Sequence, residues 1–568
     1  MSDTTRQEQE DHRERERFFS AARLVAGLTV LSRLLGMARD IAIVALGATR
    51  ATDAFWTAFS VPNLLRRLFG EGALAAAFVP VFTEVSEAEG WDKARLVLAN
   101  TAGLLALVLA GLLLLGEAGL LAWLALARPE WDTALLLRLT AIMLPFMFTI
   151  CLLALGSAAL QCKGRFAYPA FAPIVLNVFL IAAATVVHTQ IRQRGAVQLT
   201  VLAVAVVVAG AVQLAGVAWL LRRAGLSAPL QLRPVMRPVR RVARMLLPMM
   251  IPLGVMQFSA FFDRIYAWWM TATPGEPSLS ILGWTVQRPL APGVVTCLYA
   301  ATRLYMFPLG ILAISLATAV FPLMSRYAAR KDTLGLRATT NRALRLSLFL
   351  GVPAGLGLFL LAEPTITLIY RHGRFQDAAR PAAILRMYTL GMWAYFANHI
   401  LLRAYYAQTD TRTPIRVTGS LAVVNMLLVV VLVFPLKASG IGLATACTAS
   451  LNAILLAGLL RRRWGRLGGR RLALSAARTA VASAVMGGAV LGAQWLLAGP
   501  AEAIATGLGQ SWVYSAVTVL GAVVAGAGAY LLAALLLRCD ELAELLGRAP
   551  APKAQATMGH EESEHTDA

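Results

Sequence analysis

The chain has 568 residues, of which 58% are hydrophobic and 14% are charged, and its formal net charge is +22. A single soluble core of this composition would leave a large apolar area facing water, so the composition excludes an ordinary soluble domain and predicts an integral membrane protein. The five cysteines are scattered and lack CxxC spacing, which argues against a cysteine metal cluster or a disulfide framework.

Fourteen stretches are long and apolar enough to cross a bilayer, where a helix needs about 20 mostly apolar residues. In chain order they are 21–47, 54–83, 94–126, 134–160, 169–188, 197–221, 244–270, 296–324, 341–361, 381–408, 415–435, 439–460, 474–497 and 511–537. The stretches 54–83 and 381–408 are the least apolar of these. We therefore expect an all-α integral membrane protein with about 14 transmembrane helices.

Both ends of the chain are polar. Residues 1–17 have mixed charge and lead directly into an apolar stretch, so we expect no cleavable signal and assign 1–20 to a cytoplasmic tail. Residues 539–568 are also polar and poor in aromatic side chains, which is typical of a solvated cytoplasmic tail. The sequence assigns neither tail a function.

The loops alternate between many and few basic residues. Lys and Arg number seven in 222–244, six in 325–345 and seven in 461–478, but two in 189–196, one in 271–295 and none in 498–510. Because short cytoplasmic loops collect Lys and Arg, we expect both termini in the cytoplasm. Most of the net charge then reflects topology, which argues against nucleic acid as a partner and predicts contact of the basic loops with anionic membrane lipids.

The longest basic loop, 223–243, separates six predicted spans from eight and is taken as a boundary between two lobes. A repeat of small residues and proline supports related lobes. AAAFVPVF, with Ala75, Ala77 and Pro80, recurs as ATAVFPLM, with Ala317, Ala319 and Pro322. We expect an N-terminal lobe at 21–222, a C-terminal lobe at 244–460 and a final pair of spans at 461–538, as in transporters built from parallel repeats.

Several arginines lie inside predicted spans rather than in loops, namely Arg33, Arg39, Arg66, Arg67 and Arg303. A charge at the centre of a bilayer helix costs about 2.5–3.5 kcal/mol on insertion scales, so these side chains must face water, an anion or protein partners. Arg33 and Arg39 are six residues apart, which places them on one broad helical sector. Because the guanidinium is a planar fork of donors that stays charged, the set predicts a cavity for an anionic cargo such as a phosphate or diphosphate.

The second predicted span is expected to bend near its arginines. In SVPNLLRRLFGEGALAAAFVP, Pro62, Gly70 and Gly72 weaken the helix, and interrupted helices are tolerated at membrane depth only where they line a cavity or are buried in protein. Gly36, between Arg33 and Arg39, permits a close backbone approach. These glycines and the proline are candidate hinges.

Each arginine also has a simpler explanation. Arg39 can pair with Asp40 or Asp53, Arg67 can pair with Glu71 at the i,i+4 spacing, and residues near a span's end can extend to the interface. The spans contain few acids, however, so pairing within the protein leaves a surplus of positive charge. Asp53, in ATDAF, is most simply interpreted as the N-cap of the second span.

A set of motifs between about residues 24 and 460 resembles the MurJ/MviN family of lipid II flippases. In chain order the motifs are SRLLGMARD, ATDAF, VPNLLRRLFGEGALAAAFVPVF, RFAYPAFAPIVLN, ATRLYMFP, HGRF, RAYYAQTDTRTP and PLKASGIGLATA. The first three together are highly specific. The last two spans match the family only in hydropathy, and the tails do not match.

The resemblance implies the fold of the multidrug/oligosaccharidyl-lipid/polysaccharide (MOP) exporters, with two lobes around a central cavity and two extra C-terminal helices forming a groove for a lipid tail. It implies that the cargo is lipid II, the undecaprenyl-diphosphate-linked peptidoglycan precursor, which is moved from the inner to the outer leaflet of the bacterial cytoplasmic membrane. The family's essential cavity arginines correspond to Arg33, Arg39, Arg66 and Arg303. The resemblance therefore implies a transporter, not an enzyme, and makes the cell-wall synthesis machinery a candidate partner.

Two departures from the family concern charged sites. Where the family usually has an acid before the arginine of the eighth span, this chain has Thr302, and Met306 stands at a second acidic position. Some members bind sodium in the C-terminal lobe, and the matching positions are Asp263, Asn425, Ile441 and Thr445, with Val429 in place of a further polar ligand. The resemblance thus leaves sodium as a candidate cofactor, with pairing of Asp263 and Arg264 as the alternative.

Other functions are weighed against this one. The loop 271–295 is longer than is usual for the family, and its Pro, Gly and Trp content predicts an ordered external flap or an interfacial segment. A flippase of the same fold for another polyprenyl-diphosphate-linked glycan would use the same arginines. A glycosyltransferase would need a cluster of catalytic carboxylates in an external loop, where the sequence offers isolated acids such as Glu276, Glu363 and Asp377. A scaffold that binds the cell-wall machinery without moving lipid is the remaining alternative.

Overall fold

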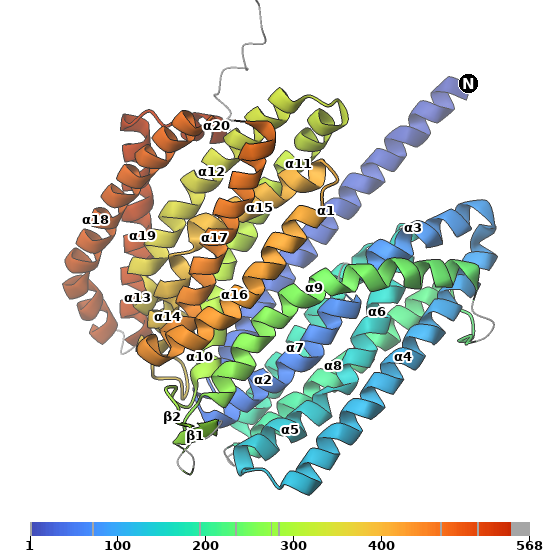
Figure 1. Cartoon of the computed structure of the whole chain (residues 1–568), viewed down its shortest axis with the longest axis horizontal. Coiled ribbons are helices and arrows are strands. Elements are labelled where there is room, and N and C mark those ends of the chain that lie inside the picture. The colour runs from blue at the N-terminus through green and yellow to red at the C-terminus, as the bar shows by residue number, and fades with distance from the viewer. Residues whose placement is uncertain are drawn as a thin grey trace, which may run out of the picture. The chain divides into compact units, whose positions relative to one another are not determined.

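The structure is a computed structural model, and it describes residues 3–546 except 71–72, 192–194, 233–235, 274, 276, 282–283, 466–467 and 508–510. It is almost entirely helical, as predicted (Figure 1). The chain divides into two compact units. The first comprises Met1–Leu304, Ile366–Tyr388 and Ile415–Thr448, and the second comprises Tyr305–Thr365, Thr389–Pro414 and Ala449–Ala568. These units do not follow the predicted lobes, whose boundary stays a prediction.

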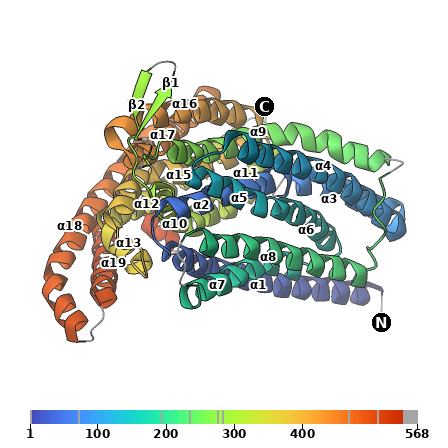
Figure 2. The ribbon, with the colours of Figure 1, turned by 90° about the horizontal axis from the view of Figure 1, so that it is seen from below.

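The first unit contains most of the chain's N-terminal half. Its elements are α1 (Asp3–Val44), α2 (Arg50–Leu65), the π-helix η1 (Arg66–Gly70), α3 (Ala73–Ala88), α4 (Gly90–Ala127), α5 (Trp131–Met143), α6 (Pro145–Cys162), α7 (Ala167–Thr189), α8 (Ala196–Arg223), α9 (Arg237–Trp269), β1 (Ser278–Ile281), β2 (Trp284–Gln287), and most of α10 (Val294–Pro308), α14 (Ala379–Thr389) and α16 (Arg412–Leu436). In this unit α1 packs on α7, α7 packs on α8, and α2 packs on α5 and α9. Figure 2 shows α1, α7 and α8 side by side.

The second unit contains the C-terminal helices. Its elements are the π-helix η2 (Leu309–Ala313), α11 (Ile314–Ala329), α12 (Thr333–Leu360), α15 (Met392–Ala407), α18 (Gly469–Gly507), α19 (Ser511–Leu536) and α20 (Asp540–Leu545), while α13 (Ala362–Tyr370) and α17 (Ala438–Trp464) have residues in both units. Helices α18 and α19 form a closely packed pair, and α18 also packs on α12. The pair is joined to α12 by a core that includes Phe349, Met486 and Tyr530.

Ten of the fourteen predicted spans correspond to helices that are long and apolar enough to cross a membrane, judged over the described residues. The predicted spans 21–47, 54–83, 244–270 and 381–408 are also helical but fall outside this apolar set. Two of these four contain Arg39, Asp40, Arg66 and Arg67 of the site described below, whereas Arg303 lies in an apolar span. Helices α2, α3 and α15 have 16 residues each, so the spans 54–83 and 381–408 are divided into short helices.

The predicted bend in the second span is present. Helix α2 contains Pro62, ends at Leu65 and is followed by a π-helix that begins at Arg66. A comparable succession occurs later, where α10 ends at Pro308 and the π-helix η2 precedes α11. Both α3 and α11 then have 16 residues with an internal proline, Pro80 and Pro322, which agrees with the predicted repeat. Single-turn π segments often occur at functional sites.

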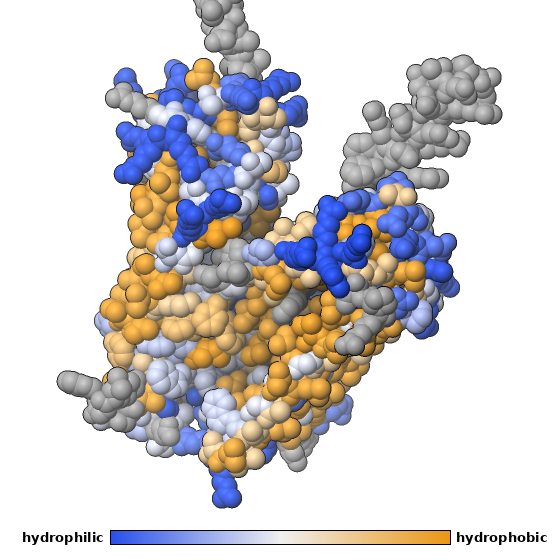
Figure 3. All heavy atoms as spheres, turned by 45° about the vertical axis from the view of Figure 1, so that its right-hand side comes forward, coloured by the Kyte–Doolittle hydropathy of each residue, from blue (hydrophilic) through white to orange (hydrophobic). Residues whose placement is uncertain are grey.

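The long loop 271–295 forms an ordered element, as expected from its composition. Strands β1 and β2 pair antiparallel, with Ser278 opposite Gln287 and Leu279 opposite Val286. The hairpin joins the end of α9 to the start of α10 (Figure 2). In Figure 3, apolar side chains cover much of the flanks of the helices and polar side chains gather towards the helix ends, as a membrane protein requires.

The C-terminal tail differs from its prediction as a solvated segment. Residues 540–545 form α20, in which Glu541 is buried. The acids of α20 meet Arg342 and Arg345 of α12, so attraction between opposite charges, which composition does not show, orders this part of the tail. Residues 547–568 lie outside the described part of the chain.

Candidate anion-binding site

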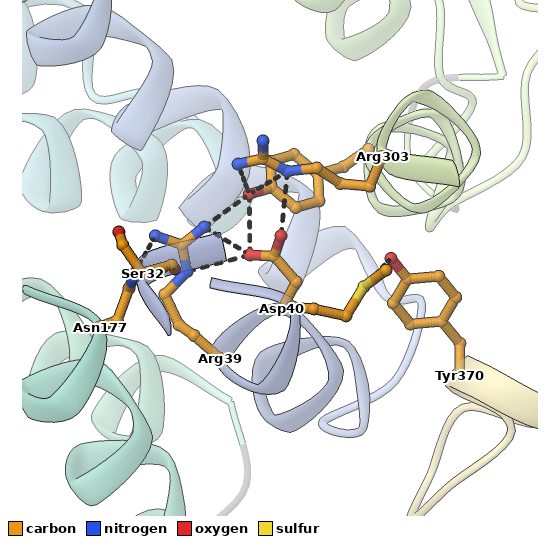
Figure 4. A network of polar contacts seen from close by, with 8 residues as sticks. Ser32, Arg39, Asp40, Asn177, Arg303 and Tyr370 are labelled. Carbon is orange, nitrogen blue, oxygen red and sulfur yellow. Dashed lines mark hydrogen bonds and ion pairs between the residues drawn. The ribbon is translucent and has the colours of Figure 1, made fainter. Parts of the chain in front are cut away.

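The site begins with two adjacent charges on α1. Arg39 donates from Nε (2.9 Å) and Nη2 (2.6 Å) to Asp40 Oδ1, and both side chains are buried. Its remaining nitrogen, Nη1, donates to Oδ1 of Asn177 on α7 at 2.9 Å, and the amide of Asn177 in turn donates to the carbonyl of Ser32 at 3.0 Å (Figure 4). The packing of α1 on α7 therefore fixes the Arg39 guanidinium in one orientation.

Helix α10 contributes the other half of the site. The Tyr299 hydroxyl donates to Asp40 Oδ1 at 3.0 Å and accepts from Nη2 of Arg303 at 2.7 Å. Nε of Arg303 lies 2.9 Å from Asp40 Oδ2, so a single carboxylate holds two guanidiniums (Figure 4). The Tyr299 ring stacks on Trp56 of α2 with centroids 3.6 Å apart, which positions the hydroxyl. We call Arg39, Asp40, Tyr299 and Arg303 the arginine network.

Two further arginines stand at the bend of the second span. Arg66 donates to Oδ1 of Asn63 at 3.2 Å, and Nη1 of Arg67 donates to Oε1 of Gln257 on α9 at 2.7 Å. The Arg66 guanidinium also interacts electrostatically with Arg39 and Arg303. Each of these half-buried cations donates a hydrogen bond to a neutral amide oxygen.

The charge of the site is therefore unbalanced. Asp40 neutralises one of the two guanidiniums that contact it, which leaves a net positive charge on the arginine network. The Arg303 side chain is 40% exposed, whereas Asp40 is buried, so one flank of the network is accessible. Positive charge in excess beside an accessible flank is suited to bind a mobile anion, in particular a phosphate, through charge-assisted hydrogen bonds.

The structure joins Arg39 and Arg303 directly but leaves Arg33 outside the network. Arg33 is exposed on α1 and has no hydrogen bond or ion pair with any described residue. Gly36 faces Asn177, where an added Cβ would lie 3.6 Å from the amide nitrogen, an ordinary contact. The simpler pairing of Arg39 with Asp40 is present, and it coexists with the second cation, Arg303.

Sequence reasoning missed the role of Asp40 as a shared carboxylate and assigned no role to Tyr299 or Asn177. Tyr299 lies four residues before Arg303, a spacing that places both on one helix face, and this signal was available. Asn177 was visible only as part of a motif. Arg264 was considered as a partner for Asp263, and the two side chains interact electrostatically.

The expected N-cap role of Asp53 is wrong. Thr49 caps α2, with a reciprocal capping box to Thr52. The buried Asp53 carboxylate instead accepts from the backbone of Gly293 (2.7 Å) and Thr296 (2.8 Å) and so caps the start of α10. The contact with α10 spans more than two hundred residues of sequence, so local spacing did not reveal it. Asp53 thereby positions the helix that carries Arg303.

Of the other candidate hinges, Pro62 and Gly70 lie in described helices and Gly72 does not. Pro62 is buried inside α2, and Gly70 is the last residue of η1. Glu71 and Gly72 lie outside the described residues, so pairing of Arg67 with Glu71 stays a prediction.

Two of the four residues proposed for sodium converge. The Asn425 amide nitrogen lies 3.3 Å from Asp263 Oδ1 and 3.3 Å from the Ser259 hydroxyl, and Thr448 donates to Asn425 Oδ1 at 3.1 Å. Thr445 instead donates to the Ile441 carbonyl of its own helix at 3.1 Å. These oxygens suit a hard monovalent cation only if the Asn425 amide turns its oxygen towards Asp263.

Solved structures of membrane transporters share this fold. A lipid II flippase MurJ in an inward-closed conformation matches with a TM-score of 0.69 at 21% identity, over 91% of this chain and 99% of that chain. An inward-facing multidrug resistance transporter of the MATE family matches with a TM-score of 0.62 at 15% identity, over 78% of this chain and 98% of that chain. The chain thus has the fold that these two membrane proteins share.

Sequence relatives give the family within this class. The family model described as lipid II flippase MurJ matches residues 43–502. A probable lipid II flippase MurJ of Vibrio cholerae is 30% identical over 551 residues, which cover 92% of this chain and 96% of the relative. One of Bdellovibrio bacteriovorus is 32% identical over 544 residues, which cover 94% and 97%. The chain belongs to the MurJ family of lipid II flippases.

Proposed function

We propose that this protein flips lipid II from the inner to the outer leaflet of the bacterial cytoplasmic membrane, and that the arginine network binds the diphosphate. The observation that carries the proposal is the sharing of one buried carboxylate by guanidiniums from α1 and α10, with further arginines beside them. The family supplies the identity of the cargo. Another polyprenyl-diphosphate-linked glycan would present the same diphosphate, but nothing in the family comparison favours it.

The geometry suggests how binding is coupled to movement. Asp40 holds Arg39 and Arg303 through their donors in the absence of cargo, and a diphosphate competes for the same donors. Because Arg39 belongs to the predicted N-terminal lobe and Arg303 to the C-terminal lobe, one anion then contacts both. Alternating access requires such differential contacts between states. The bend at η1 and Pro62 absorbs the accompanying change in α2.

The orientation completes the proposal. The basic loops support a topology with both termini in the cytoplasm, in which the diphosphate enters from the cytoplasmic leaflet. The prenyl chain stays in lipid against the α18–α19 pair, whose surface exposes Trp495, Leu496 and Val524. Anionic lipid headgroups contact the basic loops, and the cell-wall synthesis machinery receives the lipid outside.

Sodium is proposed as an ion that the Asp263 cluster holds. Asp263, Ser259 and Asn425 supply one carboxylate, one hydroxyl and one amide oxygen, the ligand chemistry of a hard cation. Replacing potassium by sodium should raise the melting temperature of the wild-type protein and leave that of Asp263→Asn unchanged. An equal rise in both proteins argues against this site.

The transport proposal is tested by replacing Arg33, Arg39, Arg66 and Arg303 singly with Ala in cells depleted of their own flippase. Outer-leaflet accessibility of lipid II should fall at least tenfold for Arg39→Ala and Arg303→Ala, because each loses charge-assisted hydrogen bonds worth about 1.5–3 kcal/mol. Arg241→Ala, which removes an exposed pair with Glu84, is the matched control. Full transport by all four variants at normal expression overturns the proposal.

Lysine replacements sharpen the same test. If the network recognises the diphosphate by two parallel hydrogen bonds, Arg303→Lys restores less transport than wild type because an ammonium is a point charge. If charge alone is required, Arg303→Lys is equivalent to wild type.

A further inference from the structure

Helix α15, in the second unit, carries an arginine within a predicted membrane span. Arg403 belongs to the span 381–408 and lies one helical turn before α15 ends at Ala407. Its guanidinium lies over the Phe321 ring of α11, 5.1 Å from the ring centroid, and the side chain is half-buried. Arg403 forms no hydrogen bond or ion pair with any described residue. The aromatic contact positions the guanidinium without supplying a counter-charge.

Two further donors share the face of α15 that carries Arg403. His399, Arg403 and Tyr406 are spaced i, i+4 and i+7, which places them on one side of the helix along about 10 Å of its axis. Both His399 and Tyr406 interact electrostatically with Arg403, and neither forms a hydrogen bond within the described part of the chain. Tyr406 is 38% exposed. An imidazole, a guanidinium and a phenol thus present unused donors on one accessible face.

A cavity adjoins this face at the end of the helix. Helices α11, α12 and α15 pack on one another (Figure 1), and a cavity of about 420 Å³ lies at their ends. Its lining includes Ser325 and Ala407. These residues follow Phe321 and Arg403 by four positions, so the cavity begins one helical turn beyond the contact of the guanidinium with the aromatic ring. A molecule held by Arg403 can therefore extend into this cavity.

The chemistry of the cavity and the face suits a phosphate group. A guanidinium fork binds phosphate through charge-assisted hydrogen bonds, and a neutral imidazole and a phenol each add one donor. Lys331 lines the cavity and forms no ion pair with a described residue. The carboxylate of Asp332, also on the cavity wall, accepts from the backbone of Gly335 as the N-cap of α12. The basic loop 325–345 supports a position of this end of the unit at the cytoplasmic headgroups.

We propose that His399, Arg403 and Tyr406 bind the phosphate of a membrane lipid, whose headgroup occupies the adjoining cavity. Two kinds of lipid carry this group, namely a phospholipid of the same leaflet and a polyprenyl diphosphate on its way to the arginine network. The site shares no residue with the arginine network and goes beyond the proposed function, because a phospholipid supplies the same chemistry without being transported.

The test measures the affinity of the full-length protein for three lipids by native mass spectrometry. The lipids are phosphatidylglycerol, undecaprenyl diphosphate and diacylglycerol, which has acyl chains but no phosphate. Arg403→Gln should weaken binding of a phosphate-bearing lipid about tenfold, because charge-assisted hydrogen bonds are lost, and should leave diacylglycerol binding unchanged. Tyr406→Phe should weaken binding of the same lipid about threefold. A loss confined to phosphatidylglycerol identifies a resident phospholipid, whereas a loss confined to undecaprenyl diphosphate identifies an entry site for the cargo.

The matched control is Arg326→Gln, at an exposed arginine near the same end of α11, which should change each affinity less than twofold. Equal losses in Arg326→Gln and Arg403→Gln mean general attraction to a basic surface and overturn the site. Unchanged binding of both phosphate-bearing lipids in Arg403→Gln overturns it as well. Equal wild-type affinity for phosphatidylglycerol, undecaprenyl diphosphate and diacylglycerol overturns it without any mutation, so a variant that fails to fold does not block the test.

The proposed function fails by a different result. If the wild type binds phosphatidylglycerol at this site but does not bind undecaprenyl diphosphate, the arginine network is not a diphosphate site and the phospholipid site stands.

Discussion

The protein contains two groups of arginines that differ in the number of acids beside them. In the second unit, Arg342 and Arg345 of α12 meet three acids of α20, namely Asp540, Glu541 and Glu544. In the first unit, Arg39 and Arg303 share Asp40, and Arg66 and Arg67 have amide partners. We call the contact of Arg342 and Arg345 with the acids of α20 the α20 clamp. Acids in excess close a structural contact, whereas arginines in excess leave a site that an anion can enter.

The α20 clamp offers the largest expected effect. In Arg345→Met, the buried Glu541 loses its cation, which lies 3.1 Å away, and keeps the Ser475 hydroxyl at 2.8 Å. Breaking a buried pair by removing one partner costs about 3–5 kcal/mol, so the free energy of unfolding should fall by about 3 kcal/mol. Lipid II affinity should change less than twofold. Chemical unfolding and lipid binding in the same nanodisc preparation measure both quantities.

Arg241→Met is the control for this variant, because Arg241 pairs with Glu84 at an exposed position and should cost less than about 1 kcal/mol. A tenfold loss of lipid affinity in Arg345→Met with unchanged stability would remove the distinction between the two groups.

Asp40→Asn tests the arginine network, in which arginines outnumber acids. In the wild type, the Asp40 carboxylate occupies donors of Arg39 and Arg303 that the diphosphate needs. Neutralising it should tighten lipid II binding about tenfold, or about 1.4 kcal/mol, and slow transport because release becomes unfavourable. Binding in nanodiscs and outer-leaflet accessibility of lipid II give the two readouts.

Asp132→Asn provides the matched control for Asp40→Asn. Asp132 is equally buried and accepts from Arg50 Nε at 2.7 Å, away from the arginine network. The Asp132→Asn variant should have a lower free energy of unfolding than the wild type and the same affinity for lipid II. Weaker binding in Asp40→Asn would show that this carboxylate supports the anion site rather than competing with the anion.

Tyr299→Phe tests the hydroxyl that bridges the network. The variant keeps the ring that stacks on Trp56 and loses the hydrogen bonds to Asp40 and Arg303. Loss of one buried hydroxyl contributes about 1 kcal/mol, so lipid II affinity should fall about fivefold. Tyr370→Phe is the control, since among the described residues the Tyr370 hydroxyl donates to the Met37 sulfur at 3.9 Å and makes no hydrogen bond to the arginine network. A similar loss in Tyr370→Phe would contradict a specific role for Tyr299.

The sequence predicted much of this site because membrane burial makes charge conspicuous. Arg39 and Arg303 were recognisable from the cost of placing them in apolar spans, and the bend was recognisable from Pro62 and the glycines. The partners were harder to predict. The sequence predicts a possible ion pair of Asp40 with the adjacent Arg39, but nothing in it shows that α10 approaches the same carboxylate.

Long-range contacts account for the other errors. Asp53 has the local spacing of a cap for α2, but its hydrogen-bond donors belong to α10. The sequence predicts a solvated tail at the acids of α20, because the arginines that pair with these acids lie about two hundred residues earlier. Composition and periodicity determine which segments cross the membrane, whereas pairings between distant segments depend on packing that neither quantity describes.

The smallest expected effect concerns Asp410, in the loop between α15 and α16. Burial raises the pKa of Asp410, but hydrogen bonds from Thr413 and the pairing with Arg463 outweigh it and lower this pKa to about 2. A carboxyl whose pKa is lower in the folded state stabilises the fold above its unfolded pKa near 4, and this contribution disappears as the pH falls through 2. Solvent screening at a helix end limits the contribution to about 1 kcal/mol.

Asp410→Asn should therefore lower the free energy of unfolding by about 1 kcal/mol at pH 7, with the difference from wild type shrinking below pH 4. Asp92→Asn, at a side chain that is 93% exposed, should cause no change at either pH. Because Asp410 and Arg463 are matched one to one, lipid II affinity should stay at the wild-type value throughout. A loss of affinity that follows the same pH dependence would mean that balanced pairs also contribute to cargo binding, and that an excess of arginine is not what distinguishes the site.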